Sequence, residues 1–130
     1  MIVGIGTDLA EVDRIRKSMD RYGDRFLKRV YTDAEIAYAS RKANQAERFA
    51  ARFAAKEAGM KALGTGLRRG VTWKDFEVIN ESSGRPALRL SGVAQQIAGR
   101  MKVGRISLSL THTAEMAMAV VIFEDCVEGS

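Results

Sequence analysis

Apolar and polar positions alternate, or recur at helical spacing, along the chain, and these patterns predict its elements in order. Residues 2–7 form a short apolar run that is typical of a buried strand. Successive side chains of a strand point to opposite sides, so we expect Gly4, Gly6 and Asp8 on one side. Because glycine has no side chain, another backbone segment or a ligand is expected to approach closely beside Asp8.

The next segments have helical periodicity. Residues 11–19 carry apolar side chains at helical spacing, and the pattern resumes after a break at residues 22–23, which predicts two short helices. Thr32 and Glu35 match a capping box, in which the two side chains satisfy free backbone amides at a helix start. A third helix is therefore expected to run from there to about Arg41.

The longest predicted helix covers residues 45–63, which are rich in alanine and contain no proline. It is expected to end at residues 64–66, Gly-Thr-Gly, because glycine commonly terminates helices. At about 100° per residue, Glu57 lies at the edge of the apolar stripe and Lys56 lies within it. A cation in that position needs a carboxylate or phosphate partner. The stripe itself consists of Phe49, Phe53, Met60 and Leu63.

The C-terminal half of the chain has mainly strand patterns. Residues 71–80 and 87–90 flank a turn and predict a hairpin, and a short helix is expected over residues 93–101. Residues 105–113 alternate between apolar and polar and are expected to pair antiparallel with the apolar strand 117–123. This order of elements predicts an α+β fold in which helices pack on an antiparallel sheet.

The composition agrees with one globular domain. Of the 130 residues, 46% are apolar and 28% are charged, a balance typical of soluble proteins. We expect the domain to span residues 1–123, followed by a short C-terminal tail at 124–130. No apolar run approaches the roughly 20 residues that cross a bilayer, and the first residues do not resemble a signal peptide, so a cytoplasmic protein without membrane contact is expected. Cys126 is the single cysteine, which excludes a disulfide framework.

Positive charge is concentrated near the N-terminus. The net charge is +5, and residues 14–29 contain seven lysines and arginines but only two acidic residues. Such a surface attracts an acidic protein, a nucleic acid or an anionic membrane, unless it is only a solvated helix face. Tyr22 and Phe26 are the aromatic residues within it, too few for base stacking, and no RNA-binding motif is present. We therefore expect no nucleic-acid partner.

Asp8 and Glu57 are the first candidates for chemistry. Two carboxylates brought together in a half-buried place repel each other unless a cation neutralises them, and Mg²⁺ prefers such oxygen ligands. A site with two carboxylates leaves coordination positions for water and for a substrate phosphate. The alternative is structural: Asp8 caps the following helix, and Glu57 pairs with a lysine such as Lys61, four residues later on the same helix face.

Other residues are suited to phosphate binding. Gly-Thr-Gly at 64–66 and the arginines that follow form a flexible loop, although this loop matches neither the P-loop nor the dinucleotide motif. His112 lies on the apolar side of its strand near the end, where a lone histidine is more often a hydrogen-bonded core residue than a catalyst. The hydroxyl of Thr113 beside it offers a phosphate contact. Residues 83–86 form either an ordinary hairpin turn or a turn that presents Arg85 to a ligand.

Three segments are more specific than any of these features alone. The first is Gly-Ile-Gly-Thr-Asp-Leu at residues 4–9. The second covers residues 49–66 and contains Phe-Ala-Ala-Lys-Glu-Ala with a further lysine and Gly-Thr-Gly downstream. The third is Ser-Leu-Ser-Leu-Thr-His-Thr at residues 107–113, and Gly-Arg-Pro at 84–86 is a minor marker. Together they resemble the holo-acyl-carrier-protein synthase family of phosphopantetheinyl transferases, over essentially residues 1–123.

The resemblance implies an activity and a cofactor. Members of this family transfer the 4'-phosphopantetheine group of coenzyme A to a serine of apo acyl carrier protein, releasing adenosine 3',5'-bisphosphate, in support of fatty acid biosynthesis. By resemblance, Asp8 and Glu57 bind the Mg²⁺ that also holds the pyrophosphate of coenzyme A, and Lys61 lies against the phosphate under attack. The base that takes the serine proton stays open between a metal-bound water and Glu57. The residues expected around the adenosine and its 3'-phosphate are Arg52, Gly64, Thr65, Gly66, Arg85, Pro86, His112 and Thr113.

The resemblance also implies protein partners. The family assembles as a trimer with active sites at subunit contacts, so a homotrimer is expected here. An adaptor that binds an acidic protein without any chemistry is the competing hypothesis, and it predicts that Asp8 and Glu57 are dispensable. The residues expected to bind the acidic carrier protein are Arg14, Met19, Arg21, Arg25 and Phe26.

Overall fold

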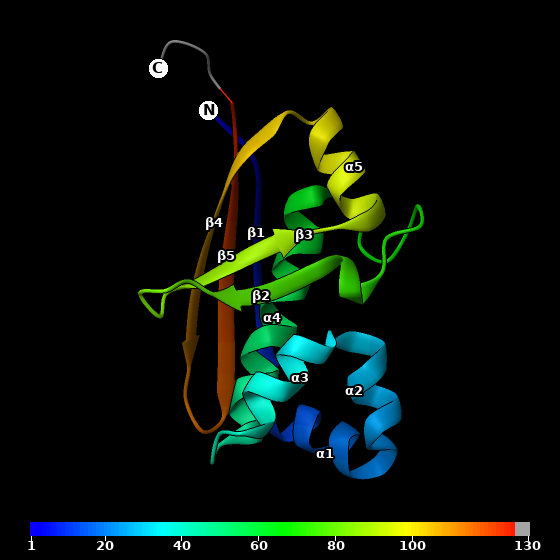
Figure 1. Ribbon diagram of the computed structural model, residues 1–130, viewed down its shortest axis with the longest axis vertical. Helices are drawn as coiled ribbons and strands as arrows, with labels where there is room; N and C mark the ends of the chain where they lie inside the picture. Colours follow the sequence, from blue (N-terminus) through cyan, green and yellow to red (C-terminus); the bar gives the residue numbers. More distant parts are fainter. Residues whose placement is uncertain (127–130) are drawn as a thin grey trace.

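Two sheets and five helices make up the fold in the computed structural model, which describes residues 1–126. Figure 1 shows three long strands side by side and a shorter hairpin that crosses α4. Among the described residues, no helix is both long and apolar enough to cross a membrane. In chain order the elements are β1 (Ile2–Glu11), α1 (Val12–Tyr22), α2 (Asp24–Val30), α3 (Asp33–Ser40), α4 (Gln45–Leu63), a short 3-10 helix (Trp73–Asp75), β2 (Phe76–Asn80), β3 (Pro86–Leu90), α5 (Gly92–Arg100), β4 (Val103–His112) and β5 (Met116–Asp125).

The long sheet has the strand order β1-β5-β4, and both strand pairs are antiparallel. Thr7 of β1 and Ser109 of β4 both pair with Val120 of β5. Alternate residues of β5, among them Ala119 and Phe123, are fully buried on the side that faces α4. The predicted pairing of the last two strands and the α+β class, with helices packed on an antiparallel sheet, are confirmed.

The predicted helices are also confirmed. α1 and α2 separate at Gly23, and the side chains of Thr32 and Glu35 form the predicted capping box at the start of α3. α4 covers the predicted residues and ends at Gly64, whose φ of 84° lies in the left-handed region that favours glycine.

The central helix α4 packs very closely on β1 because β1 has glycine at the contact. A Cβ added to Gly6 would lie only 1.9 Å from the carbonyl oxygen of Ala58. On another side of α4, Gly59 faces the ring of Phe76 at the start of the hairpin. α4 therefore lies between the long sheet and the β2–β3 hairpin (Figure 1). The expected close approach of backbone beside Asp8 is confirmed.

Gly6→Ala is expected to lower the free energy of unfolding by about 3 kcal/mol, because the added methyl group overlaps helix backbone that cannot rotate away. Gly99→Ala in α5 is the matched control, since a Cβ there meets no atom within 4 Å. The control is expected to be neutral or slightly stabilising. Urea unfolding followed by circular dichroism measures both variants, and equal stabilities would contradict the close packing of α4 on β1.

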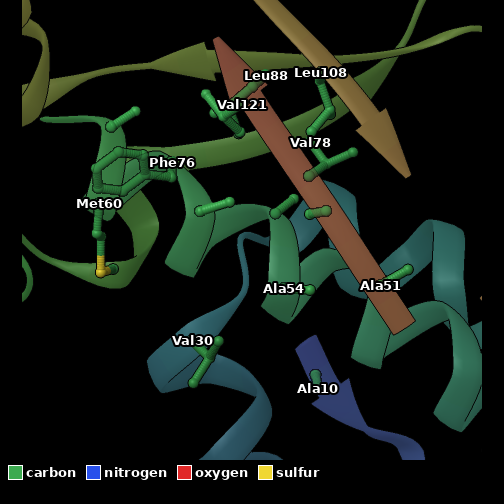
Figure 2. Packing of buried hydrophobic residues seen from close by; sticks show 14 of the residues in the cluster. Ala10, Val30, Ala51, Ala54, Met60, Phe76, Val78, Leu88, Leu108 and Val121 are labelled. Carbon is green, nitrogen blue, oxygen red and sulfur yellow. The ribbon is translucent and has the colours of Figure 1, made fainter. Parts of the chain in front are cut away.

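The hydrophobic core fills the space between the long sheet, the hairpin and α4. Figure 2 shows Val78 and Leu88 of the hairpin beside Leu108 and Val121 of the long sheet. α4 contributes mainly alanines, which let both layers approach the helix. The predicted single stripe on α4 is too narrow: the helix is buried on most sides because two layers cover it, whereas Phe53 within the stripe is only partly buried.

A buried ion pair joins three elements of the core. Nζ of Lys56 in α4 lies 2.6 Å from Oε1 of Glu35 in α3, and both side chains are fully buried. The carboxylate of Glu35 also accepts hydrogen bonds from the amides of Thr32 (2.9 Å) and Val78 (2.9 Å). Lys56 donates a further hydrogen bond to the carbonyl oxygen of Phe76. Lys56 thus has the carboxylate partner that its buried position requires.

The boundaries of β1 and of the first hairpin strand differ from the prediction. β1 continues to Glu11, so Asp8 lies inside the strand and not at its end. The hairpin strand begins at Phe76, later than expected, because Thr72 and Asp75 form a local capping box around the 3-10 helix that precedes it. The start of β2 is thus set by local hydrogen bonds, whereas the end of β1 is set by its pairing with β5.

The C-terminal strand extends past the predicted end. β5 reaches Asp125, whose carboxylate lies 2.8 Å from the terminal ammonium group of Met1. The amide of Cys126 donates a hydrogen bond to the carbonyl oxygen of Lys102 (3.2 Å). The first two positions of the segment 124–130, expected to be a tail, are therefore strand, and residues 127–130 lie outside the described residues.

Candidate functional site

A cavity of about 250 Å³ opens between β1, α1 and α4. Asp8 and Glu57, the two carboxylates singled out in the sequence, both line it, together with Glu11 of β1. Asp8 is held there by β1, on the side of the strand that faces α4, where glycine lets the helix come close. We call this space the acidic cavity. The strand and the helix thus bring Asp8 and Glu57 to one place.

The electrostatics of the acidic cavity favour a bound cation. Burial raises the pKa of the Glu57 carboxyl, and the neighbouring charge of Asp8 raises it further, whereas Lys61 and Arg14 act in the opposite direction. The ionised form of Glu57 is therefore disfavoured by its surroundings. A divalent cation between the two carboxylates relieves this penalty.

Lys61, one turn after Glu57 on α4, contacts the cavity residue Asp8. Its Nζ lies 3.2 Å from Oδ1 of Asp8 and donates a hydrogen bond to the carbonyl oxygen of Thr7 (2.9 Å). The side chain is 55% exposed, whereas that of Asp8 is only 13% exposed. The ammonium group is therefore accessible to an anionic substrate while it is anchored to β1.

The fold contradicts the structural alternative, in which Asp8 caps the following helix and Glu57 pairs with a lysine. The residue that caps α1 is Glu11 and not Asp8, and no side chain makes a capping hydrogen bond there. Lys61 pairs with Asp8 and not with Glu57, for which the ion pairs of residues 1–126 include no partner. Glu57 therefore lacks a basic ion-pair partner within the described part of the chain.

The donor set fits Mg²⁺ that also binds substrate. Within residues 1–126 no group of three or more His, Cys, Asp or Glu side chains is arranged to hold a metal ion. Asp8 and Glu57 offer carboxylate oxygens, the ligand type that Mg²⁺ prefers, and Mg²⁺ commonly binds through one or two carboxylates while water and substrate phosphates complete its shell. The two carboxylates beside an open cavity match this mode of Mg²⁺ coordination.

A second cavity of about 210 Å³ lies between α3, α4, the hairpin turn and β4. Arg48, Arg52 and His112 line it together with Pro86 and Tyr38, and no acidic side chain of residues 1–126 does. We call it the cationic cavity. It contains three of the residues expected around a nucleotide, namely Arg52, Pro86 and His112.

Arg52 is the most unusual side chain of the cationic cavity. It is only 4% exposed, and its guanidinium lies 4.4 Å from the ring of Tyr38. One NH₂ group donates to Oδ1 of Asn80 (3.2 Å), whereas Nε is buried without a hydrogen-bond partner among the described residues. Burial lowers the pKa of this guanidinium from its ordinary value. A buried arginine in this state is suited to binding an anion.

Other predicted residues lie outside both cavities. Gly64, Thr65 and Gly66 follow the C-terminal end of α4. Arg85 lines a small separate depression between the hairpin turn and β4. The hydroxyl of Thr113 accepts hydrogen bonds from the amides of the β4–β5 turn, so it has a structural role there. The described chain therefore does not gather the expected nucleotide site into one place.

Three polar side chains that line the cationic cavity were not expected from the sequence. Arg48 precedes Arg52 by one helical turn, and this i, i+4 spacing is a signal for a shared face. Tyr38 and Asn80 come from α3 and β2, and no local pattern connects them with the cavity.

The basic helices flank the acidic cavity. Arg14 of α1 and Phe26 of α2 line the cavity itself. Arg21 and Arg25 are exposed, whereas Met19 is partly buried and packs against the core. Of the expected carrier-binding residues, Arg14 and Phe26 therefore reach the acidic cavity, whereas Met19 lines a separate depression.

Known proteins of the family that the sequence motifs resemble match almost the whole chain. A sequence model of the 4'-phosphopantetheinyl transferase superfamily matches residues 4–121. The holo-[acyl-carrier-protein] synthase of Solibacter usitatus is 63% identical over 125 residues, which cover 96% of this chain and 100% of the relative.

Solved structures agree in fold. The holo-[acyl-carrier-protein] synthase of Neisseria meningitidis superposes with a TM-score of 0.88 at 30% identity, covering 96% of this chain and 100% of the other. That of Bacillus anthracis, solved in complex with CoA (3',5'-ADP), superposes with a TM-score of 0.79 at 38% identity, covering 97% and 99%. The chain therefore belongs to the holo-[acyl-carrier-protein] synthase family of the 4'-phosphopantetheinyl transferase superfamily.

Proposed function

We propose that this protein is a cytoplasmic enzyme that transfers 4'-phosphopantetheine from coenzyme A to a serine of apo acyl carrier protein, which supports fatty acid biosynthesis. The observation that carries the proposal is the acidic cavity, in which Asp8 and Glu57 meet beside Lys61. The similarity to a relative solved with CoA (3',5'-ADP) supports the choice of donor.

The residues of the acidic cavity have distinct roles in this reaction. Asp8 and Glu57 would hold Mg²⁺, which when bound neutralises charge on the diphosphate of coenzyme A. Lys61 donates hydrogen bonds to the phosphate under attack from a position fixed by the carbonyl oxygen of Thr7. Both groups lower the repulsion that an incoming oxygen meets at an anionic phosphorus.

The bond changes balance without a further reactant. A bond forms between the serine oxygen of the carrier and the phosphorus that bears the pantetheine, and the bond from that phosphorus to the bridging oxygen breaks. The leaving group is adenosine 3',5'-bisphosphate, and the serine proton goes to water or to a carboxylate of the cavity.

The carrier protein is proposed to dock on the basic surface of α1 and α2. Arg21 and Arg25 supply exposed positive charge, and Phe26 supplies an apolar contact at the acidic cavity. Met19 supplies a second apolar contact in a separate depression. Arg14 lies at the boundary, where it lines the cavity itself. An acidic carrier bound here places its serine near Asp8 and Glu57.

The cationic cavity is proposed to receive the nucleotide end of coenzyme A. Arg52 and His112 provide donors for a phosphate, and Pro86 provides an apolar wall. The two cavities share no lining residue, and Arg52 and Glu57 point about 140° apart around α4. We therefore propose that one coenzyme A contacts the acidic cavity of one chain and the cationic cavity of a neighbour.

A homotrimer is proposed because the outer side of the long sheet is apolar and exposed. Ile5 is 58% exposed, Leu9 is 64% exposed, and Met118, which pairs with Leu9, is 42% exposed. Val120 and Ile122 lie on the same side and are only partly buried. Contiguous apolar surface of this kind commonly marks a subunit interface.

Ile5→Asp combined with Met118→Asp is expected to convert the trimer to monomers and to abolish transfer, since the proposed site needs two chains. Leu67→Asp is the control, because Leu67 is 50% exposed in the loop after α4 and not on the sheet. Sedimentation equilibrium and a transfer assay on the same samples measure both effects. Monomers that keep full activity would contradict the shared site, and an unchanged oligomer would contradict the proposed interface.

The experiment that tests the proposed function uses the protein with coenzyme A, Mg²⁺ and an apo acyl carrier protein, followed by mass spectrometry of the carrier. We expect a phosphopantetheine adduct on the carrier that disappears when the metal is removed with a chelator. Unmodified carrier under all conditions would contradict the proposed activity, and an adduct that persists with chelator would contradict the metal requirement.

A further inference from the structure

His112 has a partner that the reaction described above does not use. Nδ1 of its ring lies 3.1 Å from Oε1 of Glu47, which comes in the first turn of α4. The two side chains are only 25% and 22% exposed. The contact links the last residue of β4 to the start of α4, at a separation of 65 residues in the sequence.

This contact determines which ring nitrogen faces the cationic cavity. An ionised carboxylate only accepts hydrogen bonds, so Nδ1 of His112 carries a hydrogen and donates it to Glu47. His112 lines the cationic cavity, whereas Glu47 lines a different depression, next to Met19. Nε2 is therefore the polar atom that the ring offers to a ligand in the cationic cavity.

The surroundings of Nε2 suit a phosphate monoester. Arg48 and Arg52 line the same cavity, and Nε of Arg52 is buried without a hydrogen-bond partner in the described part of the chain. A phosphate bound between Arg52 and His112 accepts hydrogen bonds from both. The imidazolium form of His112 donates from both nitrogens, to Glu47 on one side and to the phosphate on the other.

We propose that Glu47 is a positioning residue, which holds His112 so that Nε2 donates to a phosphate monoester at the nucleotide end of the donor substrate. This inference rests on the proposed function, because it takes coenzyme A as the donor. It assigns a role to a residue outside the cavity, and it places recognition of the monoester phosphate apart from the acidic cavity where the bonds change.

Steady-state kinetics of Glu47→Ala and Glu47→Gln test the proposal, with coenzyme A and dephospho-coenzyme A as donors. Glu47→Ala is expected to raise KM for coenzyme A about tenfold, the effect of misaligning one charge-assisted hydrogen bond, with kcat nearly unchanged. Glu47→Gln is expected to recover part of this loss, because its amide oxygen still accepts from Nδ1. Dephospho-coenzyme A lacks the monoester phosphate, so its KM is expected to be the same in all three proteins.

Two results would overturn the role of Glu47. One is an unchanged KM for coenzyme A in Glu47→Ala. The other is an equal rise of KM for both donors, which indicates general damage to the fold. Gln45→Ala, an exposed substitution in the same turn of α4, is the control and is expected to behave as wild type.

Calorimetry separates this inference from the proposed function, because it needs no turnover. Adenosine 3',5'-bisphosphate is expected to bind Glu47→Ala about tenfold more weakly than wild type, whereas adenosine 5'-phosphate is expected to bind both equally. Equal weakening for the two ligands, or none for the bisphosphate, would contradict the role of Glu47. A wild-type protein that binds the bisphosphate but transfers nothing would instead contradict the proposed function.

Discussion

Glu57→Gln is expected to lower kcat/KM for phosphopantetheine transfer by about 10²- to 10³-fold, the usual cost of removing one charged group that stabilises a transition state. The amide of glutamine is nearly the same size as the carboxylate of Glu57, but it has no charge with which to bind a cation together with Asp8. The loss is expected without loss of stability, because burial and the charge of Asp8 already raise the pKa of Glu57 and so disfavour its ionised form.

Activity and stability are measured on the same Glu57→Gln protein. A transfer assay measures the activity, and thermal unfolding at neutral pH measures the stability, where Glu57→Gln is expected to equal or exceed wild type. Asp33→Asn, an exposed substitution in the first turn of α3, is the charge-matched control and is expected to keep full activity. Full transfer activity in Glu57→Gln would contradict the role of Glu57 in the reaction, and a large fall in its melting temperature would show that Glu57 is structural.

Glu35→Ala is expected to lower the free energy of unfolding by about 3–5 kcal/mol, because it leaves Lys56 charged and buried without its partner. The burial of Lys56 already lowers the pKa of its ammonium group despite the nearby Glu35. Glu35→Ala also removes the acceptor for the backbone amide of Val78. Urea unfolding measures the effect.

A double-mutant cycle identifies the source of that loss. The double variant Glu35→Gln with Lys56→Met removes both charges. Its loss of unfolding free energy is expected to be clearly smaller than the sum of the losses in Glu35→Gln alone and Lys56→Met alone. Asp13→Ala breaks an exposed pair with Lys17 and is expected to cost less than about 1 kcal/mol. Additive single effects would mean that Glu35 and Lys56 do not act as a pair.

Local signals in the sequence were sufficient for most of the fold. α4 is predicted to the residue, because an alanine-rich segment without proline stops at Gly64. The hairpin follows from a turn between two strand-like segments, the strand at 105–113 follows from the alternation of apolar and polar residues, and the last strand follows from its apolar run. Strand ends are less predictable, since β1 and β5 extend as far as their pairing partners do, and the pattern of one strand does not contain that information.

The acidic cavity was predictable and the cationic cavity only partly so. Alternation places Asp8 beside glycine, helical periodicity places Glu57 at the edge of α4, and the family motif connects the two. The partner of Lys56 was expected to be a carboxylate or a phosphate, but only the packing of α3 on α4 identifies Glu35. Tyr38 and Asn80 enter the cationic cavity through contacts between distant segments, for which a single sequence carries no local signal.

The central claim is that Asp8 and Glu57 together hold a divalent cation for the substrate diphosphate. Mn²⁺ is a spectroscopically visible substitute with the same preference for oxygen ligands. Electron paramagnetic resonance of the protein with coenzyme A and Mn²⁺ is predicted to show about one bound ion per chain that Mg²⁺ displaces, and Asp8→Asn combined with Glu57→Gln is predicted to abolish it. Undiminished binding of Mn²⁺ by the double variant would contradict the claim.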